Sequence, residues 1–146
     1  MAVFDRSVTT DWEGGLMDGN GVAKAGTGAF SLPVTFANRI GEPAGKTSPE
    51  ELMAAAHAAC FAMAMNAALG KRGAKAKKTH VTATVSADKG DTGIKIVSSK
   101  LKVLVEGLEG MTPAEFTTFV KDADKGCPVS NAYRGTMQVD VEGSAK

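Results

Sequence analysis

The sequence predicts an α+β domain, with strands, a helix, strands, a helix and a final strand in chain order. Three observations predict it. The first third is glycine-rich with interleaved apolar residues; 18 residues from Leu52 to Leu69 carry no formal charge; and residues 79–88 and 93–107 alternate with the period of a strand. A chain of 146 residues is the usual size of one domain, so we expect residues 1–146 to form a single domain.

Short strands joined by tight turns are expected first, with one such turn at residues 18–21. Residues 37–51 then read as a loop containing two prolines. The long helix has a clear start, because Ser48 suits the cap, Pro49 suits the first helical position and Glu51 completes a capping box. This assignment leaves the neighbouring Glu50 available for another role.

Glycines 70 and 73 are expected to end the long helix. The two alternating segments after it predict an antiparallel hairpin. A second capping box, formed by Thr112 and Glu115, starts a helix that Gly126 stops. A brief helical turn after Cys127 and a closing strand at residues 136–143 complete the prediction.

Charge and composition exclude several classes of function. The formal net charge is +1, which gives no electrostatic footprint for nucleic acid. The start of the chain lacks the pattern of a signal peptide, and His57 and Asn66 would be costly toward lipid, so the uncharged helix is expected in a protein core and not in a membrane. We therefore expect a cytoplasmic protein, whose cysteines are more often catalytic or metal-binding than joined in a structural disulfide.

Cys60 lies in the middle of the long helix, three residues after His57 on the same face. Packing alone does not demand a thiol among so many alanines. Two interpretations remain open for Cys60: a redox nucleophile, or a small buried hydrophobic residue. His57 is either a packed, hydrogen-bonded core histidine or a ligand.

Cys127 follows a helix-stopping glycine and precedes a proline. If Pro128 opens a short helix, Cys127 lies at its N-terminus, where partial positive charge favours a thiolate. The other interpretation is a buried corner residue. The two cysteines are 67 positions apart, and this spacing does not settle their distance in space.

A thiolate in the middle of a helix needs a nearby cation, because the helix dipole fades within one turn of the end. Arg39 is the best-placed candidate, and Glu50 can hold its guanidinium in a bidentate pair. Glu50 lies about 15 Å from Cys60 along a straight helix. Either the helix breaks, or these residues act on Cys60 of a partner chain, so we expect an obligate homodimer. The other candidate arginines are Arg6, Arg72 and Arg134.

At this point the segments "TSPEELMAAAHAACF" and "GCPVSNAY", with the early "DWEGG" and "NRIGEPAGKTSPEEL", resemble the OsmC/Ohr superfamily of thiol-dependent peroxidases. The resemblance runs from about Trp12 to Val141. Histidine at position 57, where the organic hydroperoxide resistance branch usually has tyrosine, is more similar to the osmotically inducible OsmC branch.

The resemblance implies an intertwined homodimer, with antiparallel sheets wrapped around two long central helices. It implies a peroxidase that reduces organic hydroperoxides, and hydrogen peroxide more weakly, without metal or other cofactor. A dithiol, such as a dihydrolipoyl protein, is the implied reductant. The resemblance places the peroxidatic cysteine at Cys60, the resolving cysteine at Cys127, the glutamate at Glu50 and the active-site arginine at Arg39, with Arg6 as the fallback.

Three further hypotheses complete the sequence-based picture. Phe36, Met53, Phe61 and Met63 are expected to line an apolar substrate pocket. The main rival to the enzyme is a non-enzymatic stress protein that binds a hydrophobic small molecule. A metal site of Cys60, Cys127, His57 and His80 is a weaker rival, because the chain has no C-x-x-C pair.

Overall fold

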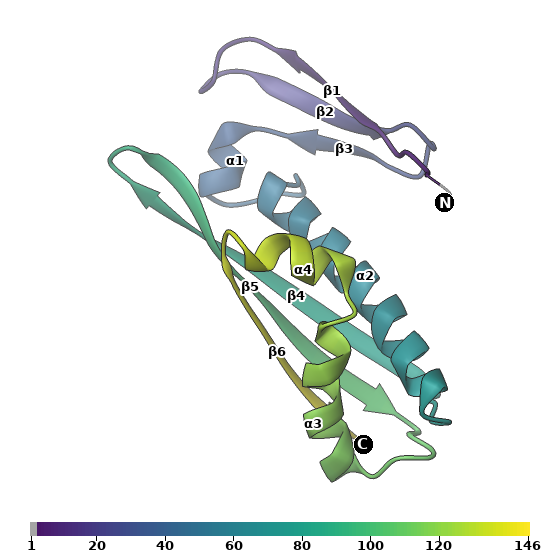
Figure 1. Cartoon of the computed structure of the whole chain (residues 1–146). Coiled ribbons are helices and arrows are strands. Elements are labelled where there is room, and N and C mark those ends of the chain that lie inside the picture. Colours follow the sequence, from purple (N-terminus) through teal and green to yellow (C-terminus); the bar gives the residue numbers. More distant parts are fainter. Residues whose placement is uncertain (1–2) are drawn as a thin grey trace. The chain divides into compact units, whose positions relative to one another are not determined.

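The computed structural model describes residues 3–146 and has the predicted α+β class (Figure 1). Its contacts group into two compact units, one ending at Pro49 and the other running Glu50–Lys146. Each unit is described by itself below. The expectation of a single domain stays a prediction.

The first unit is a three-stranded antiparallel sheet of β1 (Val8–Glu13), β2 (Asn20–Ala25) and β3 (Ser31–Val34), in the order β1-β2-β3. The prediction of short strands is confirmed. The first turn spans residues 14–19, slightly before the predicted position. It requires glycine at position 19, because a Cβ there would lie 2.1 Å from the carbonyl oxygen of Gly15.

The expected loop at residues 37–51 is wrong at its start, where the chain forms the short helix α1 (Phe36–Ile40). Thr35 caps this helix, because its hydroxyl accepts a hydrogen bond of 3.1 Å from the Asn38 backbone amide. Gly41 follows the last helical residue. The helix buries no residue, so no apolar periodicity marks it in the sequence.

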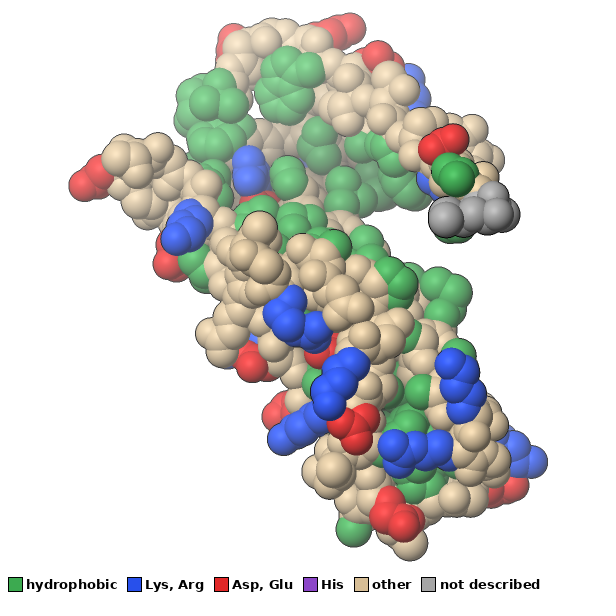
Figure 2. All heavy atoms as spheres, in the orientation of Figure 1, with side chains coloured by type: hydrophobic (Ala, Val, Ile, Leu, Met, Phe, Trp, Pro, Cys, Tyr) green, Lys and Arg blue, Asp and Glu red, His purple; other side chains and the backbone are tan. Residues whose placement is uncertain are grey.

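Among residues 3–49, Ala23 is the one hydrophobic residue that is fully buried. Larger apolar side chains stay exposed, as Figure 2 shows at the surface of this unit; they include Val8, Trp12, Leu16, Met17, Phe30 and Ile40. The first unit therefore has almost no core of its own.

The long helix is confirmed as α2 (Pro49–Lys71). It ends where the Ala74 amide donates back to the Leu69 carbonyl at 3.0 Å and Gly73 takes a φ of +69°. The capping role of Ser48 stays a prediction. One row of α2, spaced by four residues, is fully buried; it consists of His57, Phe61, Met65 and Leu69.

By length and composition alone, α2 could also cross a membrane, and 22% of its most apolar window is buried in the chain. One such helix is weak evidence, because the core helix of a soluble protein passes the same test. The expectation that the protein does not enter a membrane stays a prediction.

The predicted hairpin is confirmed as β4 (Lys78–Gly90) and β5 (Gly93–Glu106), which pair antiparallel. The last strand, β6 (Gln138–Ala145), begins two residues later than predicted and pairs parallel with β5. A β-bulge at Val97 interrupts the β4–β5 register. The apolar residues of β5 before the bulge, Ile94 and Ile96, are even-numbered, whereas the fully buried row after it is odd-numbered and consists of Ser99, Leu101, Val103 and Val105.

Both helices predicted in the second half are present. In α3 (Pro113–Asp124) the expected capping box is confirmed, since Thr112 accepts from the Glu115 amide and Glu115 accepts from the Thr112 amide. The short helix α4 (Pro128–Arg134) follows with Cys127 as its N-cap. Gly143 on β6 leaves room for α3, because a Cβ there would lie 3.1 Å from Val120.

The core of the second unit lies between one face of the β4-β5-β6 sheet and the helices α2 and α3, which share that face (Figure 1). Its fully buried members are Phe61, Met65 and Leu69 of α2; Leu101, Val103 and Val105 of β5; Phe116, Phe119, Val120 and Ala123 of α3; and Ala74 and Cys127. His57 and Ser99 form the polar end of this core, and the thiols of Cys60 and Cys127 lie near it.

Candidate functional site

The two cysteines lie together in the second unit, although 67 positions separate them in the sequence. Cys60 on α2 is half-buried and packs against the core cluster that contains Cys127. Cys127 is fully buried. Their thiols are close enough to influence one another, and both are free. The spacing in the sequence could not establish this contact; the fold does.

Two consecutive backbone amides of α4 lie next to the two cysteine sulfurs. The Val129 amide lies close enough to the Cys60 sulfur to favour its thiolate. The next amide, of Ser130, donates to Cys127 Sγ at 3.5 Å, which is the N-cap contact of α4. The first turn of this short helix therefore contacts both thiols with neighbouring donors.

The pKa of the Cys60 thiol is raised above its ordinary value, chiefly because burial disfavours the charged thiolate. The Val129 amide acts in the opposite direction, since it stabilises the thiolate and lowers the pKa. The neighbouring Cys127 raises the pKa through its hydrogen bond and its charge. A thiolate at Cys60 near neutral pH thus needs further positive charge, as the sequence indicated.

His57 is fully buried and bonded at both ring nitrogens. Its Nδ1 lies 2.6 Å from the Ser99 hydroxyl on β5, and its Nε2 lies 2.7 Å from the Ser130 hydroxyl on α4. Burial lowers the pKa of His57; Asp124 opposes this effect and Arg134 adds to it. A neutral ring donates to one serine and accepts from the other.

The C-terminal part of α4 is held by separate contacts. Tyr133 donates its hydroxyl to the Met53 carbonyl at 3.0 Å, and its ring meets the His57 ring edge to face at 5.2 Å. Arg134 pairs with the buried carboxylate of Asp124 at the end of α3. These contacts fix α4 between α2 and α3.

Two of the four candidate arginines are engaged elsewhere in the second unit. Arg134 is neutralised by Asp124. Arg72 lies over the Phe119 ring at 5.0 Å and within 4.0 Å of Asp122, near the far end of α2 from Glu50. Neither is therefore suited to serve the Cys60 sulfur.

The other two candidates belong to the first unit. Arg6 donates to the Asp5 carbonyl at 2.7 Å and lies over the Phe4 ring. Arg39 lies in the last turn of α1. Glu50 lies in the first turn of α2. Because α2 runs unbroken through Cys60, the separation of about 15 Å along the helix between Glu50 and the thiol of the same chain is retained.

The expected substrate pocket is only partly compatible with the helix. Phe61 is fully buried in the core, whereas Met63 is 69% exposed. Two residues apart on a helix, their side chains point about 200° apart. Met53 is half-buried on α2, and Phe36 opens α1 in the first unit.

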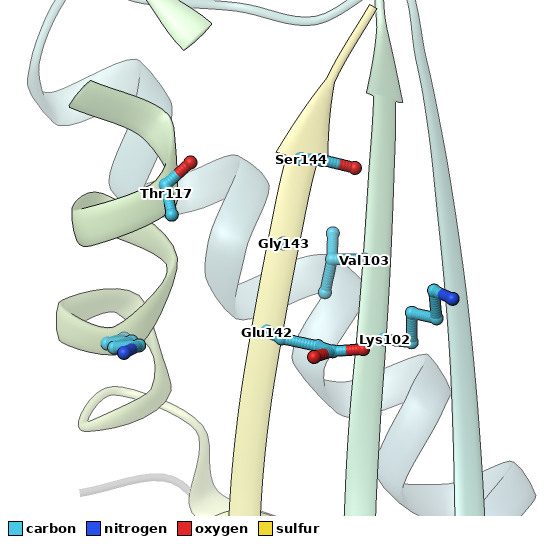
Figure 3. A pocket seen from close by; sticks show the side chains of 7 residues that line it. Lys102, Val103, Thr117, Glu142, Gly143 and Ser144 are labelled. Atoms are coloured by element: carbon cyan, nitrogen blue, oxygen red, sulfur yellow. The ribbon is translucent and has the colours of Figure 1, made fainter. Parts of the chain in front are cut away.

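A hollow of about 310 Å³ lies between α3 and the strands β5 and β6, away from the thiols (Figure 3). Lys102, Thr117 and Glu142 are among the residues that line it. Its charges are mixed, and neither cysteine borders it, so we assign it no substrate.

A metal site with His57 is not supported by the geometry, since both ring nitrogens already bond to serine hydroxyls. Within residues 3–146, no group of three or more His, Cys, Asp or Glu side chains could hold a metal ion. His80, the other histidine considered, lies 3.3 Å from Glu106 on the hairpin.

Comparison with known proteins identifies the family. The family model for OsmC-like protein matches residues 41–142. Peroxiredoxin OsmC of Escherichia coli K12 is 37% identical over 134 residues, which cover 90% of this chain and 91% of that protein. The chain belongs to the OsmC-like family. The resemblance inferred from the sequence motifs is thereby confirmed.

Other relatives agree with this assignment. Organic hydroperoxide resistance protein-like 2 of Staphylococcus epidermidis is 32% identical over 126 residues, which cover 80% of this chain and 86% of that protein. The crystal structure of an organic hydroperoxide resistance protein from Elizabethkingia anophelis superimposes with a TM-score of 0.76 at 27% identity, covering 100% of both chains. A crystal structure of an organic hydroperoxide resistance protein OsmC from Legionella pneumophila gives a TM-score of 0.75 at 26% identity over 99% of both chains.

Sequence reasoning missed four residues that contribute to this site. Val129 and Ser130 contribute backbone amides, and Ser99 and Ser130 contribute hydroxyls that bond His57. The fourth is Asp124, the partner of Arg134. One signal was present: the spacing of His57, Phe61, Met65 and Leu69 places His57 in an otherwise apolar row. A histidine in such a row needs buried polar partners.

Proposed function

We propose that this chain is a cysteine-based peroxidase that reduces organic hydroperoxides to alcohols, and hydrogen peroxide more weakly, in defence against oxidative and osmotic stress. The observation that carries the proposal is the contact between Cys60 and Cys127 in the folded chain. The names of the relatives, peroxiredoxin OsmC and organic hydroperoxide resistance protein, support the same reaction class.

In the first step, the Cys60 thiolate attacks the distal oxygen of the hydroperoxide. An S–O bond forms, the O–O bond breaks, and the leaving alkoxide takes a proton to become the alcohol. The sulfur is oxidised to sulfenic acid and the peroxide is reduced. Cys60 suits this role because it is half-buried, while Cys127 has no exposed surface.

In the second step, the Cys127 sulfur attacks the Cys60 sulfenic acid. The Cys60–Cys127 disulfide forms and water leaves, which prevents further oxidation of Cys60 to the irreversible sulfinic acid. An external dithiol then reduces the disulfide and is itself oxidised. A dihydrolipoyl protein is the proposed reductant, and no metal or other cofactor takes part.

Arg39 is the proposed cation for the Cys60 thiolate and for the charge that develops on the leaving oxygen. Glu50 is proposed to hold the guanidinium of Arg39. Because α2 is continuous, Glu50 would act on Cys60 of a partner chain, and we propose a homodimer for that reason. The exposed apolar residues of α2, Met63 among them, are consistent with a partner helix. We propose a cytoplasmic location, without binding of nucleic acid or membrane.

The substrate preference for alkyl peroxides is proposed to rest on Phe36, Met53 and Met63, because Phe61 is enclosed in the core. Comparing initial rates for cumene hydroperoxide and hydrogen peroxide tests this part alone. A faster reaction with hydrogen peroxide would contradict it without affecting the cysteine chemistry.

The decisive experiment adds one equivalent of cumene hydroperoxide to the wild type and to Cys127→Ser, and then measures free thiols and intact mass. We expect the wild type to lose both thiols and about 2 mass units, because disulfide formation removes two hydrogens. The variant should carry a sulfenic or more highly oxidised Cys60. If both thiols persist in the wild type, the chain is not a peroxidase, and the rival hypothesis of a stress protein that binds a hydrophobic small molecule takes its place.

A further inference from the structure

The two thiols depend on one turn of backbone. The amide of Val129 lies beside the Cys60 sulfur and favours its thiolate, and the amide of Ser130 donates to the Cys127 sulfur at 3.5 Å. These amides are consecutive, so a small rotation of the first turn of α4 would misalign both donors together. The orientation of this turn therefore affects both sulfurs at once.

One side-chain hydrogen bond joins the first turn of α4 to α2. The Ser130 hydroxyl lies 2.7 Å from His57 Nε2, in a fully buried position. In the same turn, Asn131 donates to the Lys125 carbonyl at 3.0 Å and accepts from Arg134 at 2.7 Å, contacts that do not reach α2 or the sheet. Tyr133 and the ion pair of Arg134 with Asp124 hold the later residues of α4. On the other side of the ring, Nδ1 is fixed by Ser99, on a strand of the sheet.

We propose that His57 is a positioning residue for both thiols. It connects the sheet to α4 and holds Ser130, so that the two neighbouring amides of the first turn face the two sulfurs. His57 itself contacts neither sulfur in any of these bonds and exchanges no proton with the substrate. This inference rests on the proposed peroxidase function, because it assigns His57 a part in the two thiol steps.

The ring nitrogens of His57 allow a matched pair of variants. The side-chain amide of asparagine reaches the position of Nδ1, and that of glutamine reaches the position of Nε2. His57→Gln should thus keep the bond to Ser130 and lose the bond to Ser99, while His57→Asn should do the reverse. Each variant loses one buried hydrogen bond, so a purely structural role predicts similar effects for both.

The first readout is the pKa of Cys60, measured from thiolate absorbance against pH in full-length chains that also carry Cys127→Ser. A hydrogen bond to a charged group is worth enough to shift this pKa by about one unit. We expect His57→Asn to raise the pKa by that amount and His57→Gln to change it by less than a third as much. Ser130→Ala should raise the pKa of Cys60 as much as His57→Asn does, and Ser99→Ala should change it as little as His57→Gln does. Because these substitutions remove only a hydroxyl, they replace the His57 variants in the test if a His57 variant does not fold.

The second readout keeps both cysteines and measures disulfide against sulfinic acid by intact mass at excess peroxide. His57→Asn should accumulate more sulfinic acid than His57→Gln, because Cys127 is less well placed to attack. Equal shifts in both variants, or no shift in either, would overturn the proposal. The titration does not depend on peroxidase activity. If the wild type did not reduce peroxide, the proposed function would be refuted, while the pKa values of Cys60 would still decide whether His57 positions the thiols.

Discussion

Each unit of this chain contains a three-stranded sheet, but the two units differ in what covers it. In Glu50–Lys146, two helices bury one face of β4-β5-β6 and close a core of twelve residues. In the unit that ends at Pro49, the sheet β1-β2-β3 has the five-residue α1, which buries nothing. The second unit has the hydrophobic burial that stabilises an independent fold, and the first does not.

The difference explains where the chemistry lies. Both thiols and the contacts that position them belong to the unit with the core, where rigid packing holds side chains in fixed geometry. The first unit exposes apolar side chains, which on a protein surface often mark a contact with another chain.

The largest difference in stability between the two units is expected when one phenylalanine of each is replaced by alanine. Phe116→Ala should lower the free energy of unfolding by about 3–5 kcal/mol, because Phe116 is fully buried between α3 and the sheet. Phe30→Ala should cost less than about 1 kcal/mol, since Phe30 is 36% exposed. Urea unfolding monitored by circular dichroism measures both. If the two costs were equal, something beyond a single chain would have to cover the first sheet.

Removing the N-cap of one helix in each unit should also destabilise the second unit more than the first, by a smaller amount. Thr112→Ala should destabilise the protein by about 1 kcal/mol, because the capping box starts a helix that buries five residues. Thr35→Ala removes the cap of α1, which buries none, and should cost only a few tenths of a kcal/mol. Urea midpoints of the two variants, measured side by side, check the ratio. A larger loss at Thr35 would show that α1 carries more of the stability than its burial indicates.

Lowering the pH should affect the second unit through His57. Burial lowers the pKa of His57 in the folded chain below the ordinary 6.5, so the unfolded chain binds a proton first as the pH falls. Stability should therefore be unaffected by this group above pH 6.5 and should decline below it. His57→Gln should remove this part of the decline, measured as the difference in the free energy of unfolding between pH 7.5 and pH 5.5. An identical decline in the variant would contradict the assignment.

The smallest effect is expected at the surface of the first unit. Lys24 and Asp11 form an ion pair of 3.3 Å between β2 and β1, with both side chains more than half exposed. Exposed pairs contribute little, so Lys24→Ala should change the free energy of unfolding by less than about 0.5 kcal/mol. The difference should vanish in 0.5 M salt. A loss above 1 kcal/mol would indicate that the pair is shielded from water.

Local signals made most of the fold predictable. Alternation gave the β4–β5 hairpin, and the capping box at Thr112 gave the start of α3 to the residue. The short α1 was missed because its signal was one threonine cap without an apolar stripe. The parallel pairing of β6 with β5 was not predicted, because pairing between distant segments depends on tertiary packing.

The candidate site was predictable in its residue types and less so in its contacts. Cys60 and Cys127 were identified from the motifs that surround them, but only the fold places their thiols together. The amide donors of Val129 and Ser130 have no side-chain signature, since any residue supplies a backbone N–H. Ser99 was hidden by the bulge at Val97, which shifts the inward-facing row by one residue.

The pairing of β6 with β5 has a consequence for the order of folding. The hairpin needs only a two-residue turn between Gly90 and Gly93, so it can form quickly from neighbouring chain. The strand β6 reaches β5 only after residues 107–137 have been closed into a loop, and this loop contains Cys127. Until that loop closes, a newly made chain would hold Cys60 without its resolving partner. This interval is when the protein is most vulnerable to the peroxides that we propose it removes.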